Sequence, residues 1–176
     1  EFFFKPDSIE DIIFFLKENK PKKINILGAG SNTLIRDGGV KGFTIKLSSK
    51  FSYLNFIEPN IIEVGAATLD KKIADFAMEH SLSELEFLSC IPGSIGGAIR
   101  MNSGCYGKDI SQILHSIKVI EMSGKEKEIL ASDIKFYYRG SSLDQNLIIT
   151  SVKLEGKPFL KEEIFKKQQN LIEKKK

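Results

Sequence analysis

The chain has 176 residues, which suits one domain or two small domains that share an interface. A hydrophobic fraction of 41% with 13 phenylalanines can build a core, and no stretch approaches the ~20 apolar residues of a membrane span. The net charge is +3, and the three lysines at 174–176 account for all of it. Charge therefore gives little reason to expect a nucleic-acid or membrane partner.

The few cysteines and histidines bear on the cellular setting of the protein and on whether it binds a metal. Cys90 and Cys105 are too few for a disulfide framework, and the N-terminus does not resemble a signal peptide, so we expect a reduced, cytoplasmic setting. His80 and His115 are isolated from each other and from the cysteines, which predicts no metal site.

The N-terminal part predicts one helix followed by two short strands. Ser8 followed by Asp11 is typical of a helix N-terminus, and apolar residues recur on one helical face as far as Leu16. Strands are expected at 23–27 and 42–47. Between them lie a glycine loop at 28–32 and a turn at 36–39.

The rest of the chain predicts hairpins and two further helices. Segments 51–58 and 61–64 form an expected hairpin, and Thr68 is expected to cap a helix whose inward residues are Leu69, Ile73, Phe76 and Ala77. Strands are expected at 113–122, 127–130 and 147–154, and a helical pattern begins at Leu160. Hairpins outnumber strand–helix–strand units, which indicates an α+β chain.

A glycine-rich stretch at 91–107 is the most informative segment. Its glycines leave room for another group to approach the backbone, and its apolar residues argue against a solvated linker. We interpret it as a semi-buried loop that presents backbone N–H groups to a ligand such as a phosphate. A tight turn between packed elements is the alternative.

The earlier glycines at Gly28 and Gly30 do not form a dinucleotide fingerprint. Thr33 stands where G-x-G-x-x-G needs its third glycine, and the turn at 37–39 leaves no room for a following helix. What remains is an anion-binding nest of consecutive N–H groups at 28–32, with an ordinary glycine turn as the alternative. A shared ligand with a pyrophosphate and an apolar ring system could occupy both glycine segments.

Three segments closely resemble those of the bacterial UDP-N-acetylenolpyruvoylglucosamine reductases. They are Leu-Gly-Ala-Gly-Ser-Asn at 27–32, the long run from Glu86 to Gly107, and Phe-Tyr-Tyr-Arg-Gly-Ser at 136–141. They occur in the family's order, and the resemblance covers nearly the whole chain. It implies the FAD-binding fold of the vanillyl-alcohol oxidase type, an α+β fold with two subdomains and FAD between them.

The resemblance also implies a division of the chain. Residues 1–48 would form an N-terminal FAD-binding subdomain, and residues 49–156 a second FAD-binding subdomain with a mainly antiparallel sheet. Residues 157–176 would form a helix that leads toward a substrate domain. Because the family's proton donor and later glutamate have no match here, we expect a piece of a longer protein that binds FAD without being active alone.

The implied reaction is the FAD-dependent reduction of UDP-N-acetylglucosamine enolpyruvate to UDP-N-acetylmuramate, with NADPH as the hydride donor, in peptidoglycan precursor synthesis. Arg139 matches the family's catalytic arginine and would stabilise negative charge on the enolpyruvyl carboxylate, while Tyr138 is expected to pack beside the site. By motif match, the cofactor-binding residues are Gly28, Ala29, Gly30, Ser31, Asn32, Pro92, Gly93, Ser94, Gly96, Gly97, Asn102 and Gly104.

Some positions depart from the family's pattern. Glu84 and Cys90 stand where glycine is usual, and Cys105 stands where alanine is usual; we expect its thiol to pack rather than to react. The alternatives are another flavin oxidoreductase of the same fold and a non-catalytic nucleotide-binding module. Small molecules are the expected partners, and a monomer is expected.

Overall fold

The structure is a computed structural model that describes residues 2–57 and 59–175. Its first layer is a small parallel sheet in the order β1-β3-β2, built from Phe2–Phe4, Phe43–Ile45 and Ile24–Ile26. Helix α1, Ile9–Asn19, begins at the predicted Ser8, whose hydroxyl accepts from Asp11 N while the Asp11 carboxylate accepts from Ser8 N. This reciprocal capping box explains why the helix begins there.

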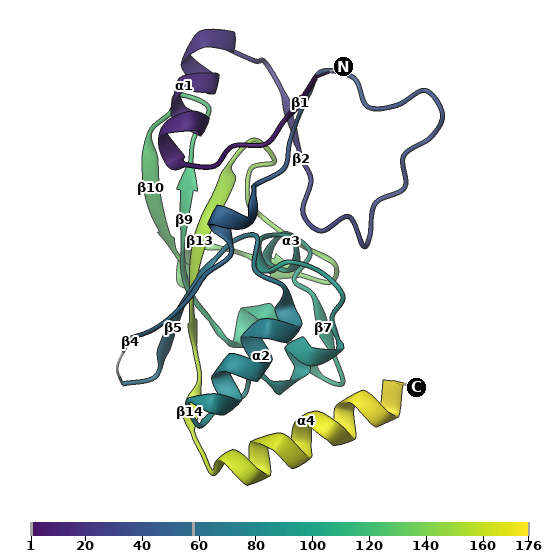
Figure 1. Ribbon diagram of the computed structural model, residues 1–176, viewed down its shortest axis with the longest axis vertical. Helices are drawn as coiled ribbons and strands as arrows, with labels where there is room; N and C mark the ends of the chain where they lie inside the picture. Colours follow the sequence, from purple (N-terminus) through teal and green to yellow (C-terminus); the bar gives the residue numbers. More distant parts are fainter. Residues whose placement is uncertain (1, 58, 176) are drawn as a thin grey trace.

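The second layer is a five-stranded antiparallel sheet in the order β10-β9-β13-β5-β4 (Figure 1). The predicted hairpins and the strand at 147–154 are confirmed, with ends shifted by a few residues. The strands are β4 (Leu54–Ile57), β5 (Ile61–Gly65), β9 (Leu114–Ile120), β10 (Glu126–Leu130) and β13 (Ile148–Glu155).

Helices lie against this sheet and at its far end (Figure 1). They are α2 (Asp70–Glu79), the short α3 (Ile95–Arg100) and α4 (Lys161–Lys175). Short 3₁₀ turns lie in the connections between elements, namely η1 (Ser49–Phe51), η2 (Glu86–Cys90), η3 (Ile110–Gln112) and η4 (Ala131–Asp133). Two-stranded ribbons complete the fold, β6 (Leu82–Ser83) with β14 (Lys157–Pro158), β7 (Gly104–Cys105) with β8 (Lys108–Asp109), and β11 (Phe136–Tyr137) with β12 (Gly140–Ser141).

The buried apolar side chains form two clusters. One joins α1 and the parallel sheet to the near end of the large sheet, through residues such as Ile12, Ile45 and Ile120. The larger one lies between the antiparallel sheet and the helices, around Ile73, Phe87 and Ile117. Two clusters suit a chain of two small units, and the boundary near residue 48 stays a prediction. No helix among the described residues is long and apolar enough to span a membrane.

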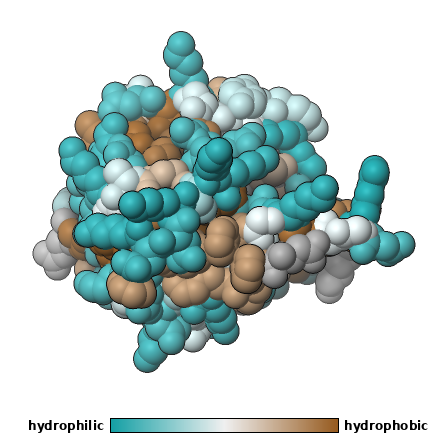
Figure 2. Space-filling model, turned by 90° about the horizontal axis from the view of Figure 1, so that it is seen from above, coloured by the Kyte–Doolittle hydropathy of each residue, from teal (hydrophilic) through white to brown (hydrophobic). Residues whose placement is uncertain are grey.

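The surface at the end that carries α1 is mostly hydrophilic, with separate hydrophobic patches (Figure 2). Phe2, Phe3 and Phe14 on β1 and α1 are all more than half exposed. So is Leu34, in the long connection between β2 and β3, which arches away from the body in Figure 1.

Three local predictions are wrong. Thr68 does not cap α2, because Leu69 is the N-cap residue and the Thr68 hydroxyl donates to Tyr53 O instead. Leu69, expected to face inward, is 46% exposed. The glycine-rich stretch is not a loop throughout, because residues 95–100 form α3, where Gly96 N donates to Ala66 O and is held by tertiary contacts despite its low helix propensity.

Candidate functional site

A cavity of about 340 Å³ lies between the two sheets, and both glycine segments line it. This volume is within the range of ligand pockets. Five of the predicted cofactor-binding residues line it directly, namely Gly28, Ala29, Ser94, Gly96 and Gly97. The other lining residues are Ile26, Leu27, Lys46, Leu47, Ala66, Ala67, Leu69, Arg100 and Ile149.

The Gly28–Asn32 segment leaves its backbone donors available. Leu27 N donates to Ile45 O and Thr33 N donates to Gly30 O, but among the described residues no acceptor pairs with the N–H groups between them. Gly30 has a φ of 87°, which favours glycine. None of the described residues between β2 and β3 is helical, as the turn at 37–39 predicts. A run of free N–H groups is the requirement for an anion-binding nest.

The Pro92–Gly97 segment behaves differently from the expected ligand-facing loop. The N–H groups of Ile95, Gly96 and Gly97 donate to Thr68 O, Ala66 O and Ser94 O. Within the described part of the chain only the N–H groups of Gly93 and Ser94 lack an acceptor in this segment. The contribution of α3 is therefore mainly shape, because a Cβ at Gly97 would meet nothing within 4 Å and the space beside its backbone stays open.

Direct contacts hold the two glycine segments together. The Ser31 hydroxyl donates to Pro92 O at 2.5 Å, and the Asn32 amide lies 3.8 Å from Met101 Sδ. A Cβ at Gly28 would come within 3.0 Å of Ser94 Oγ, so a side chain there would crowd the second segment. The structure thus brings together the segments at 28–32 and 92–97, as the resemblance implies.

Two cationic side chains line the cavity, Lys46 and Arg100. Arg100 donates from Nη1 to Asp144 O at 3.1 Å and from Nη2 to Leu147 O, so carbonyl groups orient its guanidinium. Burial lowers the pKa of Arg100 and the charge of Asp144 opposes this shift. A guanidinium held by carbonyls keeps its positive charge available to an anionic ligand.

Arg139 lies outside the cavity, in the tight turn between β11 and β12. Its φ is 61°, and its side chain is exposed. The turn is anchored beside the cavity, because the Ser141 hydroxyl donates to Arg100 O at 3.3 Å and the Tyr137 hydroxyl donates to Ser141 O at 2.7 Å. Tyr138 is 93% exposed, so the expectation that it packs beside the site is wrong.

Asn102 and Gly104 do not line the cavity, and each has a structural role. Asn102 Oδ1 accepts from Ser111 N at 3.0 Å, while a Cβ at Gly104 would clash with Lys108 O across the β7–β8 ribbon. Cys105 also packs, because its thiol donates to Phe87 O at 3.4 Å and burial raises its pKa to about 11. Such a thiol is a poor nucleophile at neutral pH. Among the described residues, no group of three or more candidate metal ligands occurs.

Lys46, Arg100 and Asp70 are residues of this region that do not belong to the motifs at 27–32, 92–97 and 136–141. Arg100 carried a signal, since it is the single charged residue between Ile91 and Gly107. Lys46 and Asp70 carried none, because a lysine in an expected strand and an acidic residue in the first turn of a helix are both common.

Comparisons with known proteins agree with this geometry. The FAD binding domain family matches residues 1–129. The chain is 44% identical over 163 residues to the UDP-N-acetylenolpyruvoylglucosamine reductase of Pelagibacter ubique (strain HTCC1062), covering 92% of this chain and 54% of that protein. It is 41% identical over 174 residues to the enzyme of the same name from Orientia tsutsugamushi (strain Ikeda), covering 94% and 57%.

The fold is similar to the crystal structure of UDP-N-acetylenolpyruvylglucosamine reductase from Thermus caldophilus, with a TM-score of 0.85 and 28% sequence identity. That match covers 98% of this chain and 61% of the other, and the chain spans about half the length of the curated relatives it matches. The family match to residues 1–129 and these relatives lead to one conclusion: the chain belongs to the FAD binding domain family.

Proposed function

We propose that this chain is the FAD-binding part of a UDP-N-acetylenolpyruvoylglucosamine reductase and that it holds FAD in the cavity between its two glycine segments. The observation that carries the proposal is the run of N–H groups at Gly28–Asn32 that find no acceptor among the described residues, in a segment that lines the same cavity as the glycines at the start of α3. The names of the relatives support the activity of the whole protein.

The residues fit this cofactor. A pyrophosphate needs several donors and positive charge, which the nest at 28–32, Lys46 and Arg100 supply. An isoalloxazine ring needs an apolar slot, and Ile26, Leu47 and Ile149 line the same cavity. When bound, FAD would supply hydride transfer, accepting a hydride from NADPH and passing it to the substrate.

The chain's own residues would bind the cofactor, hold it in place and orient the substrate's carboxylate. The Ser31–Pro92 hydrogen bond keeps the two glycine segments in place, and the open space beside Gly97 admits the cofactor. Arg139 would bind the enolpyruvyl carboxylate, whose charge rises as the neighbouring carbon is reduced. Its turn is fixed to α3 through Ser141, so the carboxylate would be held close to the cavity. Asn102 and Gly104 would stabilise the glycine-rich segment from outside the cavity.

The organisation proposed for the whole protein follows from this. Residues 1–48 and 49–156 would be the two FAD-binding subdomains, and α4 would lead toward a substrate domain. We further propose a cytoplasmic monomer whose partners are FAD, NADPH and a UDP-sugar.

Titration with FAD tests the proposal directly. Flavin fluorescence should be quenched as FAD is added to the chain, and ADP should compete more weakly because it lacks the ring system. Equal affinity for ADP and FAD would favour the nucleotide-binding module instead. Absence of quenching and of bound flavin absorbance would contradict the cofactor assignment.

A further inference from the structure

Asp70, the first residue of α2, is buried with no partner for its carboxyl group. Its relative exposure is 0%, and neither Oδ1 nor Oδ2 has a hydrogen-bond partner among the described residues. Burying a polar group without a hydrogen-bond partner destabilises the fold, so a buried carboxyl group at this position indicates a specific role.

The carboxyl group of Asp70 lies next to both glycine segments, close to Gly93 and to the Ser31 hydroxyl. Asp70 N donates to Gly93 O at 3.1 Å, and Ile95 N donates to Thr68 O at 3.0 Å, which pins the start of α2 to the second segment. A Cβ on Gly93 would lie 3.1 Å from Asp70 Oδ2 and 3.5 Å from Ser31 Oγ. The carboxyl group and the Ser31 hydroxyl therefore approach the same side of Gly93.

Burial alone accounts for the protonation of this group. It raises the pKa of Asp70 from 3.8 to about 8, and no charged side chain contributes to the shift. The segments that touch the carboxyl group, around Gly93 and Ser31, hold no ionisable side chain at those positions. The ionisable groups on the surrounding elements are Lys71, Lys72, Asp75 and Glu79 of α2, Arg36, Asp37 and Lys41 of the exposed connection, Lys46, Glu86 and Cys90 of η2, and Arg100 of α3.

We infer that Asp70 is a positioning residue that keeps its proton next to Gly93, beside the nest at 28–32, and makes FAD binding depend on that proton. The inference rests on the proposed function. A neutral acid leaves the nest at 28–32 free to attract an anion, whereas a carboxylate behind Gly93 would place a negative charge in a water-poor region next to the pyrophosphate. Its charge acts through space rather than by touching the cofactor.

Linkage fixes the sign of the effect. A bound pyrophosphate disfavours the carboxylate, so it raises the pKa of Asp70 above its value in the free chain. Below pH 8 the acid is already protonated, and binding takes up no proton. Above pH 8, binding must restore the proton, so the Kd for FAD rises by as much as tenfold per pH unit and up to one proton is taken up.

The experiment is isothermal titration of the chain with FAD at pH 6.5, 8 and 9, in buffers of different ionisation enthalpy. We expect no proton uptake at pH 6.5 and a measurable uptake at pH 8 and 9, with Kd rising across this range. Asp70→Asn should keep tight binding at pH 6.5 and lose both the uptake and the rise in Kd. Asp133→Asn, at an exposed site outside the cavity lining, is the matched control and should behave like the native chain.

The rival explanation is that Asp70 is an ordinary acidic residue stabilised by the α2 N-terminus, with no link to the ligand. It predicts FAD binding without proton uptake at pH 8 and 9, and that result in the native chain would overturn the inference even if Asp70→Asn fails to fold. Proton uptake that persists in folded Asp70→Asn would also overturn it. Absence of binding at every pH would overturn the proposed function and this inference together.

Discussion

The Ser31 hydroxyl donates to the carbonyl oxygen of Pro92 at 2.5 Å, and this bond joins two glycine segments separated by 61 positions in the chain. Through it, the connection that follows β2 of the parallel sheet is tied to the turn that precedes α3. The relative placement of the free N–H groups and the open face of Gly97 depends on this contact.

Removal of that hydroxyl should weaken FAD binding. Ser31→Ala is expected to raise the Kd about fivefold to tenfold, because a net hydrogen bond contributes about 1 kcal/mol. Fluorescence quenching measures the effect. Ser123→Ala removes a hydroxyl that accepts from Lys125 N in the β9–β10 turn and should leave the Kd unchanged. Equal effects of the two variants would contradict the role of the Ser31–Pro92 bond.

Two glycine substitutions should separate binding from stability. Gly97→Ala places a methyl group in open space inside the cavity and gains helix propensity, so the Tm should stay level or rise while FAD binding weakens at least tenfold. Gly65→Ala drives a Cβ into the Phe51 carbonyl and should lower the Tm clearly. Thermal melts and FAD titrations check both. Unchanged FAD binding by Gly97→Ala would place the cofactor elsewhere.

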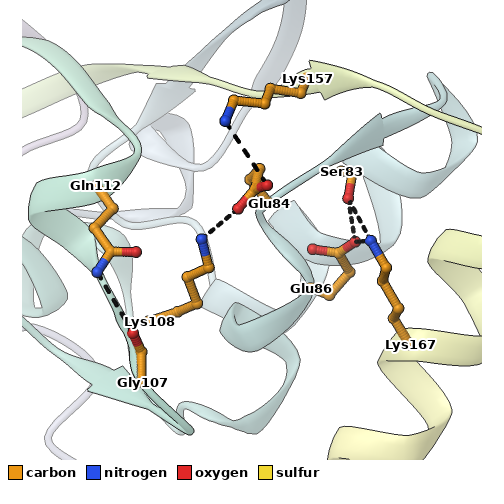
Figure 3. Close-up of polar contacts among 8 residues, drawn as sticks. All are labelled: Ser83, Glu84, Glu86, Gly107, Lys108, Gln112, Lys157 and Lys167. Atoms are coloured by element: carbon orange, nitrogen blue, oxygen red, sulfur yellow. Dashed lines mark hydrogen bonds and ion pairs between the residues drawn. The ribbon is translucent and has the colours of Figure 1, made fainter.

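Glu84 has a φ of 82°, a conformation that costs about 1 kcal/mol for a residue other than glycine. Its carboxylate pairs with Lys108 at 2.5 Å and Lys157 at 3.9 Å (Figure 3). Glu84→Gln should lower the free energy of unfolding by up to about 1 kcal/mol, since the pairs are lost and the strain stays. Glu84→Gly should be more stable than Glu84→Gln, because it also removes the strain.

The ion pairs of Glu84 should make the free energy of unfolding depend on pH. The hydrogen bond from Lys108 is the main cause that lowers the pKa of Glu84. A lowered pKa means that the contribution is present at neutral pH and is lost as pH falls through the folded-state value. The gap between native chain and Glu84→Gln should therefore close in acid. Glu79→Gln, which removes an exposed α2 charge, is the control, and a gap that stays constant as the pH falls would contradict the ion-pair explanation.

Arg139 should matter for catalysis and not for cofactor retention. In the complete protein, Arg139→Ala is expected to lower kcat by at least a hundredfold with unchanged flavin content, because the guanidinium lies in an exposed turn outside the cavity. Arg139→Lys keeps charge but not the bidentate fork and should recover part of the activity. Loss of flavin from Arg139→Ala would show that the residue is structural.

Local signals predicted the local features of the fold. The capping box at Ser8 and Asp11 involves neighbours in sequence, so the start of α1 could be predicted. Helix α3 could not be, because Gly96 and Gly97 disfavour helix and the bond from Gly96 N to Ala66 O exists only in the folded chain. The burial of Asp70 and the position of Arg100 at the cavity also result from tertiary packing. The spacing of apolar residues along a helix does not predict either of them.

Hydrogen exchange of individual amides, measured with and without FAD, shows whether FAD lies between the two glycine segments. The amides of Gly28–Asn32, Gly93 and Ser94, which lack acceptors in the described chain, should become strongly protected, while those of Gly96 and Gly97 change little because they are already bonded. Protection that falls instead on the second cavity of about 340 Å³, around Ser8, Lys50 and Lys118, would show that FAD does not lie between the glycine segments.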